Sequence, residues 1–342
     1  FSRLCHYQRR LPQLSMAMAE NEVREIHVAV GVIVRGGRVL IARRPDHVHQ
    51  GGLLEFPGGK VESEETVQAA LTREIAEETG LEIPPGTLWP VIGIRHDYGD
   101  KRVFLDVWRT DQAQGEAHGR EGQPIEWMSP ESLRDEDFPA ANRPIIRALQ
   151  LPSLLAITGD IGPDEIGIEQ LREALVRLPA SDRSPLVVLR VPGVAAEVYG
   201  SLAESALEVC EAAGAGLVLH GSLAVFDDNP DAAGLHLPWR EAEKLEARPI
   251  PDGVWLGVSC HSALQIDHAV AIGADYVTLG PVNSTATHPG ALVLGWATFR
   301  DLVSCAPIPV FGLGGLEPAD LDEVQQAGGQ GVAGIRYWWP QS

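Results

Sequence analysis

The stretch "EFPGGKVESEETVQAALTREIAEETGLEI", residues 55–83, decides the fold of the first part of this chain. It contains a glycine pair, then Thr66, then a run whose apolar residues recur at helical spacing, and it closes on Gly80. Threonine is a favoured first residue of a helix, and glycine a favoured residue just past its end. The pattern therefore predicts a helix over residues 67–79.

Glutamates gather on one face of this predicted helix. Glu74 precedes Glu77 by three residues and Glu78 by four, so the three carboxylates lie within reach of one another. Like charges at this spacing destabilise a helix, and a hard divalent cation with oxygen ligands removes the repulsion. Arg73 is placed to pair with Glu77, and the carbonyl of Gly58 is a further candidate ligand. A metal site is the interpretation we favour over a solvated acidic face.

The flanking segments predict a domain of mixed strands and helices over residues 25–150. Alternating apolar residues predict strands near 26–35 and 38–44, and later strands at 103–110 and 125–129. The stretch "NRPIIRALQ" predicts a closing helix. Strands mixed with helices in this way favour an α+β or sandwich arrangement.

The spacing of these residues resembles the Nudix box, GX5EX7REUXEEXGU. Gly59, Glu65 and "REIAEETGL" (residues 73–81) fill the whole pattern. The resemblance implies a Nudix hydrolase, an α/β/α sandwich around a mixed sheet, which cleaves a nucleoside diphosphate linked to another moiety. It also implies Mg²⁺ or Mn²⁺ as the cofactor. Such a cation polarises phosphoryl oxygens and lowers the pKa of a bound water.

The resemblance extends beyond the box, because residues 26–149 look like the MutT-type subfamily, the 8-oxo-dGTP diphosphatases. "AVGVIV", "ARRPDHVHQGGLLEFPGGK", "GREGQPIEWMS" and "DFPAANRPII" match that subfamily in order. The likeness implies hydrolysis of 8-oxo-dGTP to 8-oxo-dGMP and pyrophosphate. This reaction cleans the nucleotide pool in the cytoplasm and prevents errors of DNA replication, as expected of a mutator or DNA-repair protein.

The same likeness implies roles for individual residues. Asn142 would read the oxidised guanine edge, since an amide offers both a donor and an acceptor. Glu126 would assist the metal or act as general base. The implied substrate-binding residues are Arg44, His49, Phe56, Phe104 and Asn142. The implied catalytic residues are Arg73, Glu74, Glu77, Glu78 and Glu126, and the implied metal ligands are Gly58, Glu74, Glu77, Glu78 and Glu126.

Each of these roles has a plainer alternative. Asn142 precedes "RP" and is a residue type that begins helices, so it is also a candidate N-cap. Glu126 and Arg44 are alternatively surface charges, and Phe104 is alternatively a core residue. These alternatives stay open at the level of the sequence.

Residues 154–342 alternate short apolar strands with helical patterns. The eight strands are "LLAITGD", "LVVLRVP", "GLVLHG", "GLHLP", "WLGVSCHS", "YVTLGPV", "PVFGLGG" and "GVAGIRY". Helical patterns lie between most of them, as at 197–213, 262–272 and 317–327. Eight such units are typical of a (β/α)₈ TIM barrel, whose active site lies at the carboxyl ends of the strands. "GLGGL" follows the seventh strand, where this fold usually grips a phosphate.

This half resembles the thiamine phosphate synthase family, including its thiazole tautomerase relatives. "GVSCHSALQIDHAVAIGADYVTLGPVNSTATHPG" and "PVFGLGGLEPADLDEVQQAGGQGVAGI" carry the likeness. The chain departs from the family's pattern where that pattern holds a metal-bound pyrophosphate. "QLREK" is here "VLRVP", "ND" is "HGS", "GQDD" is "LPWRE", and Thr-Lys of the sixth loop is Thr287-His288. Lost carboxylates and lysines argue against synthase activity.

A smaller set of candidate residues remains in this half. The expected ligand site consists of Arg190, Ser259, His261, Thr285, Thr287, Gly314 and Gly315. These residues suit a phosphorylated ligand or a metal-free tautomerisation, in which His261 would transfer a proton near neutral pH. Three hypotheses follow: 8-oxo-dGTP hydrolysis beside a degenerate barrel, Nudix hydrolysis of thiamine diphosphate or its analogues, and a barrel that is a non-catalytic phosphate-ligand sensor or scaffold.

Composition limits the remaining choices. The net charge of −20 argues against binding a nucleic-acid polymer and leaves room for a nucleoside triphosphate brought in with Mg²⁺. Four scattered cysteines fit a reducing cytoplasm, and no apolar run is long enough for a membrane span. Residues 1–24 are basic; we interpret them as a leader or an over-extended gene start, and expect disorder. The sequence gives no indication of oligomeric state.

Overall fold

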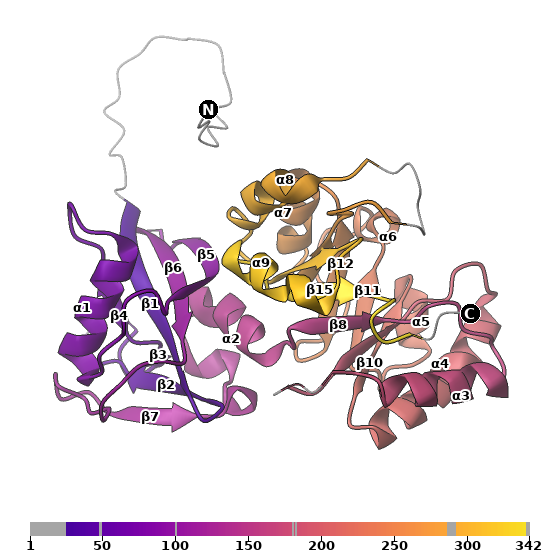
Figure 1. The fold of residues 1–342 in the computed structure, drawn as a ribbon, viewed down its shortest axis with the longest axis horizontal. Coiled ribbons are helices and arrows are strands. Elements are labelled where there is room, and N and C mark those ends of the chain that lie inside the picture. The colour runs from indigo at the N-terminus through magenta and orange to yellow at the C-terminus, as the bar shows by residue number, and fades with distance from the viewer. Residues whose placement is uncertain are drawn as a thin grey trace, which may run out of the picture.

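Two structural units follow each other along the chain, a sheet packed with helices and then a barrel (Figure 1). This computed structural model describes residues 25–339 except 48–49, 100, 180, 182 and 286–291. The predicted leader over 1–24 lies outside the described residues, as do His49 and Thr287. Within the described part, no helix has the length and apolar character needed to cross a membrane.

The first unit is built on a seven-stranded mixed sheet. The strand order is β3-β2-β1-β6-β5, with β4 paired to β1 and β7 paired to β2. Strands β1 and β6 run parallel, and the other pairs are antiparallel. The strands are β1 (Glu25–Arg35), β2 (Arg38–Arg43), β3 (Leu54–Glu55), β4 (Gly58–Lys60), β5 (Trp89–Asp97), β6 (Arg102–Thr110) and β7 (Ile125–Met128).

Helices α1 (Val67–Thr79) and α2 (Arg143–Gln150) cover opposite faces of this sheet, because the side chains of β1 alternate between them. Ala29 and Ile33 share a buried cluster with Leu71 of α1. Val32 belongs to a separate cluster with Ile145 of α2. The two cores confirm the expected sandwich around a mixed sheet.

Strand β5 was not anticipated from the sequence. It lies at the edge of the sheet order and contains Pro90 and Gly93, and its pairing with β6 shifts register between Pro90 and Ile92. Proline and glycine weaken a strand pattern, and they are tolerated mainly at edges and bulges. Tertiary pairing with β6 therefore overrides the local signal.

The second unit is a closed parallel barrel with strand order β10-β11-β12-β13-β14-β15-β8-β9. Its strands are β8 (Leu154–Ile157), β9 (Leu186–Leu189), β10 (Gly216–His220), β11 (Gly234–Leu237), β12 (Trp255–Cys260), β13 (Tyr276–Leu279), β14 (Val310–Leu313) and β15 (Gly331–Gly334). Its helices are α3 (Glu165–Leu175), α4 (Ala196–Ala212), α5 (Leu223–Asp227), α6 (Trp239–Ala242), α7 (Ala263–Ala271), α8 (Gly295–Val303) and α9 (Leu321–Gln326). The predicted (β/α)₈ barrel is confirmed.

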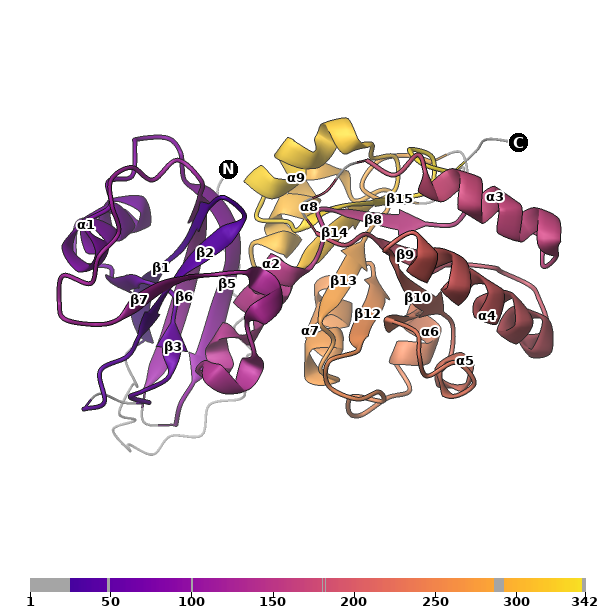
Figure 2. The same ribbon diagram turned by 90° about the horizontal axis from the view of Figure 1, so that it is seen from below.

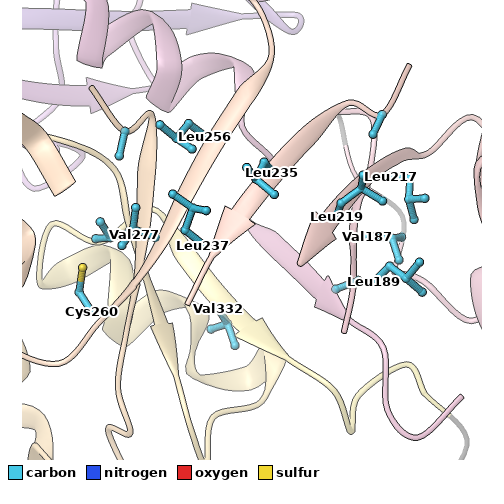
Figure 3. Close-up of a cluster of buried hydrophobic side chains, with 14 of the residues drawn as sticks. Val187, Leu189, Leu217, Leu219, Leu235, Leu237, Leu256, Cys260, Val277 and Val332 are labelled. Atoms are coloured by element: carbon cyan, nitrogen blue, oxygen red, sulfur yellow. The ribbon is translucent and has the colours of Figure 1, made fainter. Parts of the chain in front are cut away.

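Barrel side chains sort into an inner and an outer layer. Outward-facing residues such as Val187, Leu217 and Leu235 pack with the surrounding helices in one large cluster (Figure 3). A separate cluster, which includes Tyr276 and Phe311, fills the interior. The barrel is therefore a packed core, and any ligand site must lie at its ends.

Candidate functional site

Helix α1 holds the glutamates of the Nudix box in a fixed orientation. The Thr66 side chain caps its start by accepting a hydrogen bond from the Ala69 amide at 3.2 Å, and Gly80 closes it in the left-handed conformation (φ 74°). Leu71 and Ile75 are fully buried against the sheet. Glu74 consequently faces the loop at Gly59, where an added Cβ would lie 2.2 Å from its carboxyl carbon. A side chain at this position would displace the Glu74 carboxylate from the place it occupies.

Arg73 organises the carboxylates around it. Its guanidinium donates hydrogen bonds to Glu65 and Glu74, each at 2.8 Å, and lies 3.4 Å from a Glu77 oxygen. It also donates to the carbonyl of Lys60 at 3.2 Å. These bonds raise the pKa of Arg73 above its ordinary value, and they lower the pKa of Glu65. Arg73 therefore ties helix α1 to strand β4 (Gly58–Lys60), whose two glycines we call the glycine loop, and is a positioning residue of the site.

Among the described residues of the first unit, Glu78 is the carboxyl group whose pKa is shifted most. It accepts a hydrogen bond from the Gly58 amide at 3.1 Å. Burial raises the pKa of Glu78 to about 7, and the nearby charges of Glu55, Glu121 and Glu74 push it the same way. A raised pKa among crowded carboxylates shows that their negative charges repel one another in the absence of a cation. A bound divalent cation with oxygen ligands would remove that repulsion.

The donor set suits a hard divalent cation. Glu74, Glu77 and Glu78 lie on one helix face beside the Gly58 loop, and their oxygens are the ligands that Mg²⁺ and Mn²⁺ prefer. Among the described residues, no three acidic, histidine or cysteine side chains already converge as a metal cluster. Arg73 instead engages Glu74 and Glu77, so we expect these two carboxylates to exchange that contact for the cation when it binds.

A cavity of about 260 Å³ opens beside these residues. Gly58, Glu55 and Lys60 border it at the side of the glycine loop, and Asn142 lines it as well. The remaining lining residues are Ile26, Val28, Val30, Arg44, Gln50, Phe56, Tyr98, Lys101, Val103, Leu105 and Pro139. The structure thus brings Arg44, Phe56 and Asn142 together in one pocket next to the box.

Polar contacts order this pocket. Arg44 forms an ion pair with Glu55, while burial raises the pKa of Glu55 against the opposing effect of Arg44. The Phe56 ring stacks on Phe138 with centroids 5.5 Å apart. Asn142 is 9% exposed and makes no capping hydrogen bond, although it stands at the start of α2. The N-cap alternative therefore lacks its hydrogen bond in this structure.

One sequence-based expectation needs correction, and a second stays a prediction. Phe104 does not line the pocket; Val103 and Leu105 do, because alternate residues of a strand point to opposite faces. Phe104 lies under the Arg95 guanidinium at 4.2 Å instead. Glu126 is exposed on β7, opposite Ile41 of β2, and its role at the metal or as general base stays a prediction.

Glu121 stands closer to the box, and sequence reasoning missed it. Its loop is fastened to the end of α1, where the Arg120 amide and the Gln123 side chain donate to the Glu78 carbonyl at 2.9 and 3.0 Å. Its charge acts on Glu78, as does that of Glu55. Both glutamates belong to stretches quoted above, but only these tertiary contacts distinguish them from their acidic neighbours.

The barrel has its own cavity, of about 540 Å³, at the carboxyl ends of its strands. The predicted residues Arg190, Ser259 and His261 line it, together with His220 and Arg240. None of the described lining residues is acidic, although the chain carries a net charge of −20. The cavity is therefore suited to an anion.

Two further predicted positions lie in a neighbouring loop pair. Gly314 and Gly315 both have positive φ, 97° and 64°, and an added Cβ at Gly314 would meet Pro281 at 2.6 Å and Thr285 at 3.4 Å. The backbone amide of Asn283 donates to the Gly314 carbonyl at 3.0 Å. These residues fasten the loop after β14 to the loop after β13, and they are not among the residues that line the 540 Å³ cavity.

Two stacked histidines, His220 in the lining of this cavity and the buried His236 behind it, were not anticipated from the sequence. His236 contacts Tyr276 Oη at 3.2 Å through Nδ1 and Ser259 Oγ at 2.9 Å through Nε2, and its ring stacks on His220. Burial lowers the pKa of His220 to about 4 and that of His236 to about 3. Both rings are neutral at pH 7.

This burial predicts a pH-dependent stability. The folded pKa of His236 lies below its unfolded value of about 6.5, so only the unfolded chain takes up the proton between pH 6.5 and 3. Stability therefore falls as the pH is lowered through this window, by about 2 kcal/mol at pH 5 from this residue. Denaturant unfolding at pH 7 and pH 5 should show a smaller pH effect in His236→Gln. Equal pH effects in both proteins would contradict the assignment.

Comparison with known proteins identifies the first unit. The NUDIX domain family model matches residues 29–148. The 8-oxo-dGTP diphosphatase of Escherichia coli is 37% identical over 129 residues, which cover 37% of this chain and 98% of the relative. The Escherichia coli CTP pyrophosphohydrolase is 33% identical over 126 residues, covering 37% and 92%. A solved MutT structure, from a comparison of Aliivibrio salmonicida and Vibrio cholerae, covers 37% of this chain and 97% of its own at 33% identity (TM-score 0.32).

The second unit matches a different family. The thiamine monophosphate synthase family model matches residues 154–337. The thiamine-phosphate synthase of Thermosynechococcus vestitus is 34% identical over 124 residues, which cover 34% of this chain and only 35% of the relative. A Pyrococcus furiosus thiamine phosphate pyrophosphorylase structure covers 58% of this chain and 88% of its own at 21% identity (TM-score 0.41). The chain therefore belongs to the Nudix hydrolase family through residues 29–148 and to the thiamine monophosphate synthase family through residues 154–337.

Proposed function

We propose that this protein hydrolyses 8-oxo-dGTP to 8-oxo-dGMP and pyrophosphate with Mg²⁺, and so removes an oxidised precursor from the nucleotide pool. The observation that carries the proposal is the pocket that joins Asn142 to the glycine loop of the box. Water would add at a phosphoryl centre, the P–O bond between the α- and β-phosphoryl groups would break, and the two products would share the two protons of the water.

The residues of the chain divide into two groups in this proposal. Asn142 presents an amide, which donates and accepts hydrogen bonds and therefore suits an oxidised purine edge. Phe56 supplies an apolar ring surface beside it, and Arg44 supplies positive charge toward the nucleotide. Lys60 and Lys101 add two further cationic side chains at the pocket. Base and phosphates are thus met by different chemistry within the same 260 Å³ cavity.

The metal would be held by Glu74, Glu77 and Glu78, together with the carbonyl of Gly58. When bound, Mg²⁺ polarises the phosphoryl oxygens and acidifies a bound water. Arg73 keeps the carboxylates at the loop by its bonds to Glu65 and Lys60. Positioning and charge neutralisation are the main catalytic contributions in phosphoryl transfer, so a preorganised carboxylate set supports this activity.

Asn142→Ala is the direct test of base recognition. We expect it to lower the ratio of kcat/KM for 8-oxo-dGTP over dGTP by about 10- to 100-fold, since a lost buried hydrogen bond is worth about 1–3 kcal/mol. Steady-state kinetics with Mg²⁺ on the full chain would measure it, with Asn142→Asp as the variant that keeps the shape and loses the donor. Equal turnover of 8-oxo-dGTP and dGTP by the wild-type protein would refute the proposed substrate.

The same assay separates the competing substrates. CTP is included because a CTP pyrophosphohydrolase is among the relatives, and thiamine diphosphate because of the barrel's family. A preference for thiamine diphosphate would assign the Nudix site to thiamine metabolism. A preference for CTP would show that Asn142 reads a different base edge.

A second function is proposed for the barrel, as a module that binds a phosphorylated ligand without a divalent cation. Arg190 and Arg240 line its cavity, and no described lining residue offers a carboxylate for a metal. Calorimetric titration of the full chain with thiamine phosphate and with inorganic phosphate, each in EDTA, should show binding that Arg190→Ala removes. No heat of binding from either ligand would dismiss this function.

A further inference from the structure

Helix α2 connects the proposed base pocket to the barrel. Asn142 immediately precedes the helix, and Asn142 and Pro139 both line the 260 Å³ pocket. On one side, Ile145 and Ile146 are fully buried in the core of the first unit. In Figures 1 and 2 the helix lies between the sheet and the barrel. Whatever fixes α2 therefore also fixes the residue expected to read the base.

Arg147 of α2 belongs to a buried ion network that reaches into the barrel. Arg147, whose side chain is 11% exposed, donates to Asp275 at 2.9 Å and to Asp135 at 2.6 Å. The Asp275 side chain is 2% exposed. Its second oxygen accepts from Arg248 and from the backbone amide of Leu256, each at 2.9 Å. One carboxylate oxygen of Asp275 thus accepts from the first unit, and the other accepts from the barrel.

Barrel side chains also cap the last turn of α2. The Gln330 amide donates to the carbonyl of Ala148 at 3.0 Å and to that of Leu151 at 3.2 Å. Arg183 donates to the carbonyl of Leu149 at 2.7 Å. Carbonyls in the last turn of a helix have no partner within the helix. Here the barrel supplies those partners, and Asp275 also lies 3.5 Å from Arg143, the first residue of α2, so the second unit holds the helix at both ends.

We infer that the barrel positions the base-reading residue of the Nudix site by clamping helix α2 through Asp275 and Gln330. This inference rests on the proposed role of Asn142. A buried ion pair is weak evidence for stability, and the role inferred for this one is to fix the orientation of α2. Displacing a group that binds the base weakens substrate binding and so raises KM. Asp275 and Gln330 are positioning residues that act through α2, and the catalytic glutamates stand on a different helix, α1.

The clamp predicts a selective kinetic defect. Asp275→Asn and Gln330→Ala should each lower the preference for 8-oxo-dGTP over dGTP by about tenfold, through a raised KM, while kcat stays within about twofold. Glu169→Gln is the matched control, because it neutralises a barrel carboxylate in an exposed ion pair with Arg172 on α3. An unchanged preference in both folded variants, or an equal loss for both nucleotides through kcat, would overturn the inference.

A second measurement separates this inference from the proposed substrate. Hydrogen exchange of the amides in residues 142–151 should quicken by about tenfold or more in Asp275→Asn and Gln330→Ala, whereas exchange in α1 should not change. If the wild-type protein shows no preference for 8-oxo-dGTP, the proposed function fails, and exchange alone decides whether the barrel holds α2. Unchanged exchange in both variants would refute the clamp whatever the substrate.

Discussion

Glu78→Gln is expected to lower kcat/KM for nucleotide hydrolysis by at least about 10³-fold. Stabilisation of phosphoryl charge by a bound cation is worth several kcal/mol, and each 1.4 kcal/mol is a factor of ten in rate. An amide in place of Glu78 removes a charged ligand from the centre of the carboxylate cluster. Steady-state hydrolysis across a Mg²⁺ titration would measure the loss and any shift in the Mg²⁺ requirement.

Folding of this variant should be intact. Burial and the neighbouring carboxylates raise the pKa of Glu78 to about 7, so the fold disfavours its charged form when no cation is bound. Glutamine relieves that conflict, and thermal unfolding in EDTA should occur no earlier than in the wild-type protein. Glu82→Gln, an exposed glutamate of the same stretch, is the matched control. If Glu78→Gln kept more than a tenth of the activity, the metal assignment would be wrong.

Alanine should reduce mainly stability at Gly58 and mainly hydrolysis at Gly59. At Gly58 an added Cβ would lie 2.1 Å from the backbone carbonyl oxygen of Ala29, at φ 149°. Backbone cannot move aside cheaply, so Gly58→Ala should destabilise the first unit by at least about 2 kcal/mol. At Gly59 the Cβ would meet only the mobile end of Glu74, so Gly59→Ala should cost less than about 1 kcal/mol and still impair hydrolysis.

Denaturant unfolding and hydrolysis rates, measured on both variants, would test this contrast. The paired design is informative because the substitution is the same and the positions are adjacent. Loss of stability at both positions would mean that Glu74 is locked by its bond to Arg73 and cannot move. Full activity in Gly59→Ala would mean that the orientation of Glu74 is unimportant for the reaction.

Much of the fold could be predicted from local sequence signals. Short local patterns are enough to predict the helix caps at Thr66 and Gly80, the hairpin around "RGG" and the eight apolar strands. Strand β5 does not, because Pro90 and Gly93 obscure a strand whose existence depends on pairing with β6. Periodicity identifies elements with a buried face, and it is weak where an edge strand carries residues that break the pattern.

The candidate site could be predicted only as far as motifs extend. The box named Glu74, Glu77 and Glu78 because their spacing is itself the signal. The charge of Glu121 acts on Glu78 from a loop that is fastened to the end of α1, and no spacing rule encodes that proximity. Phe104 illustrates the converse, since a one-residue shift along a strand reverses which face a side chain occupies.

The ion pair between Arg147 and Asp275 has a consequence for biosynthesis. The two residues are 128 positions apart. At about 5–20 residues per second, the ribosome adds that length in roughly 6–26 s. The first unit, including α2, is therefore synthesised before Asp275 exists to pair with Arg147, and Gln330 is synthesised later still. With the inferred clamp, discrimination between nucleotides would be complete only after Gln330 has been translated, so we expect a nascent chain and a finished one to differ in this preference.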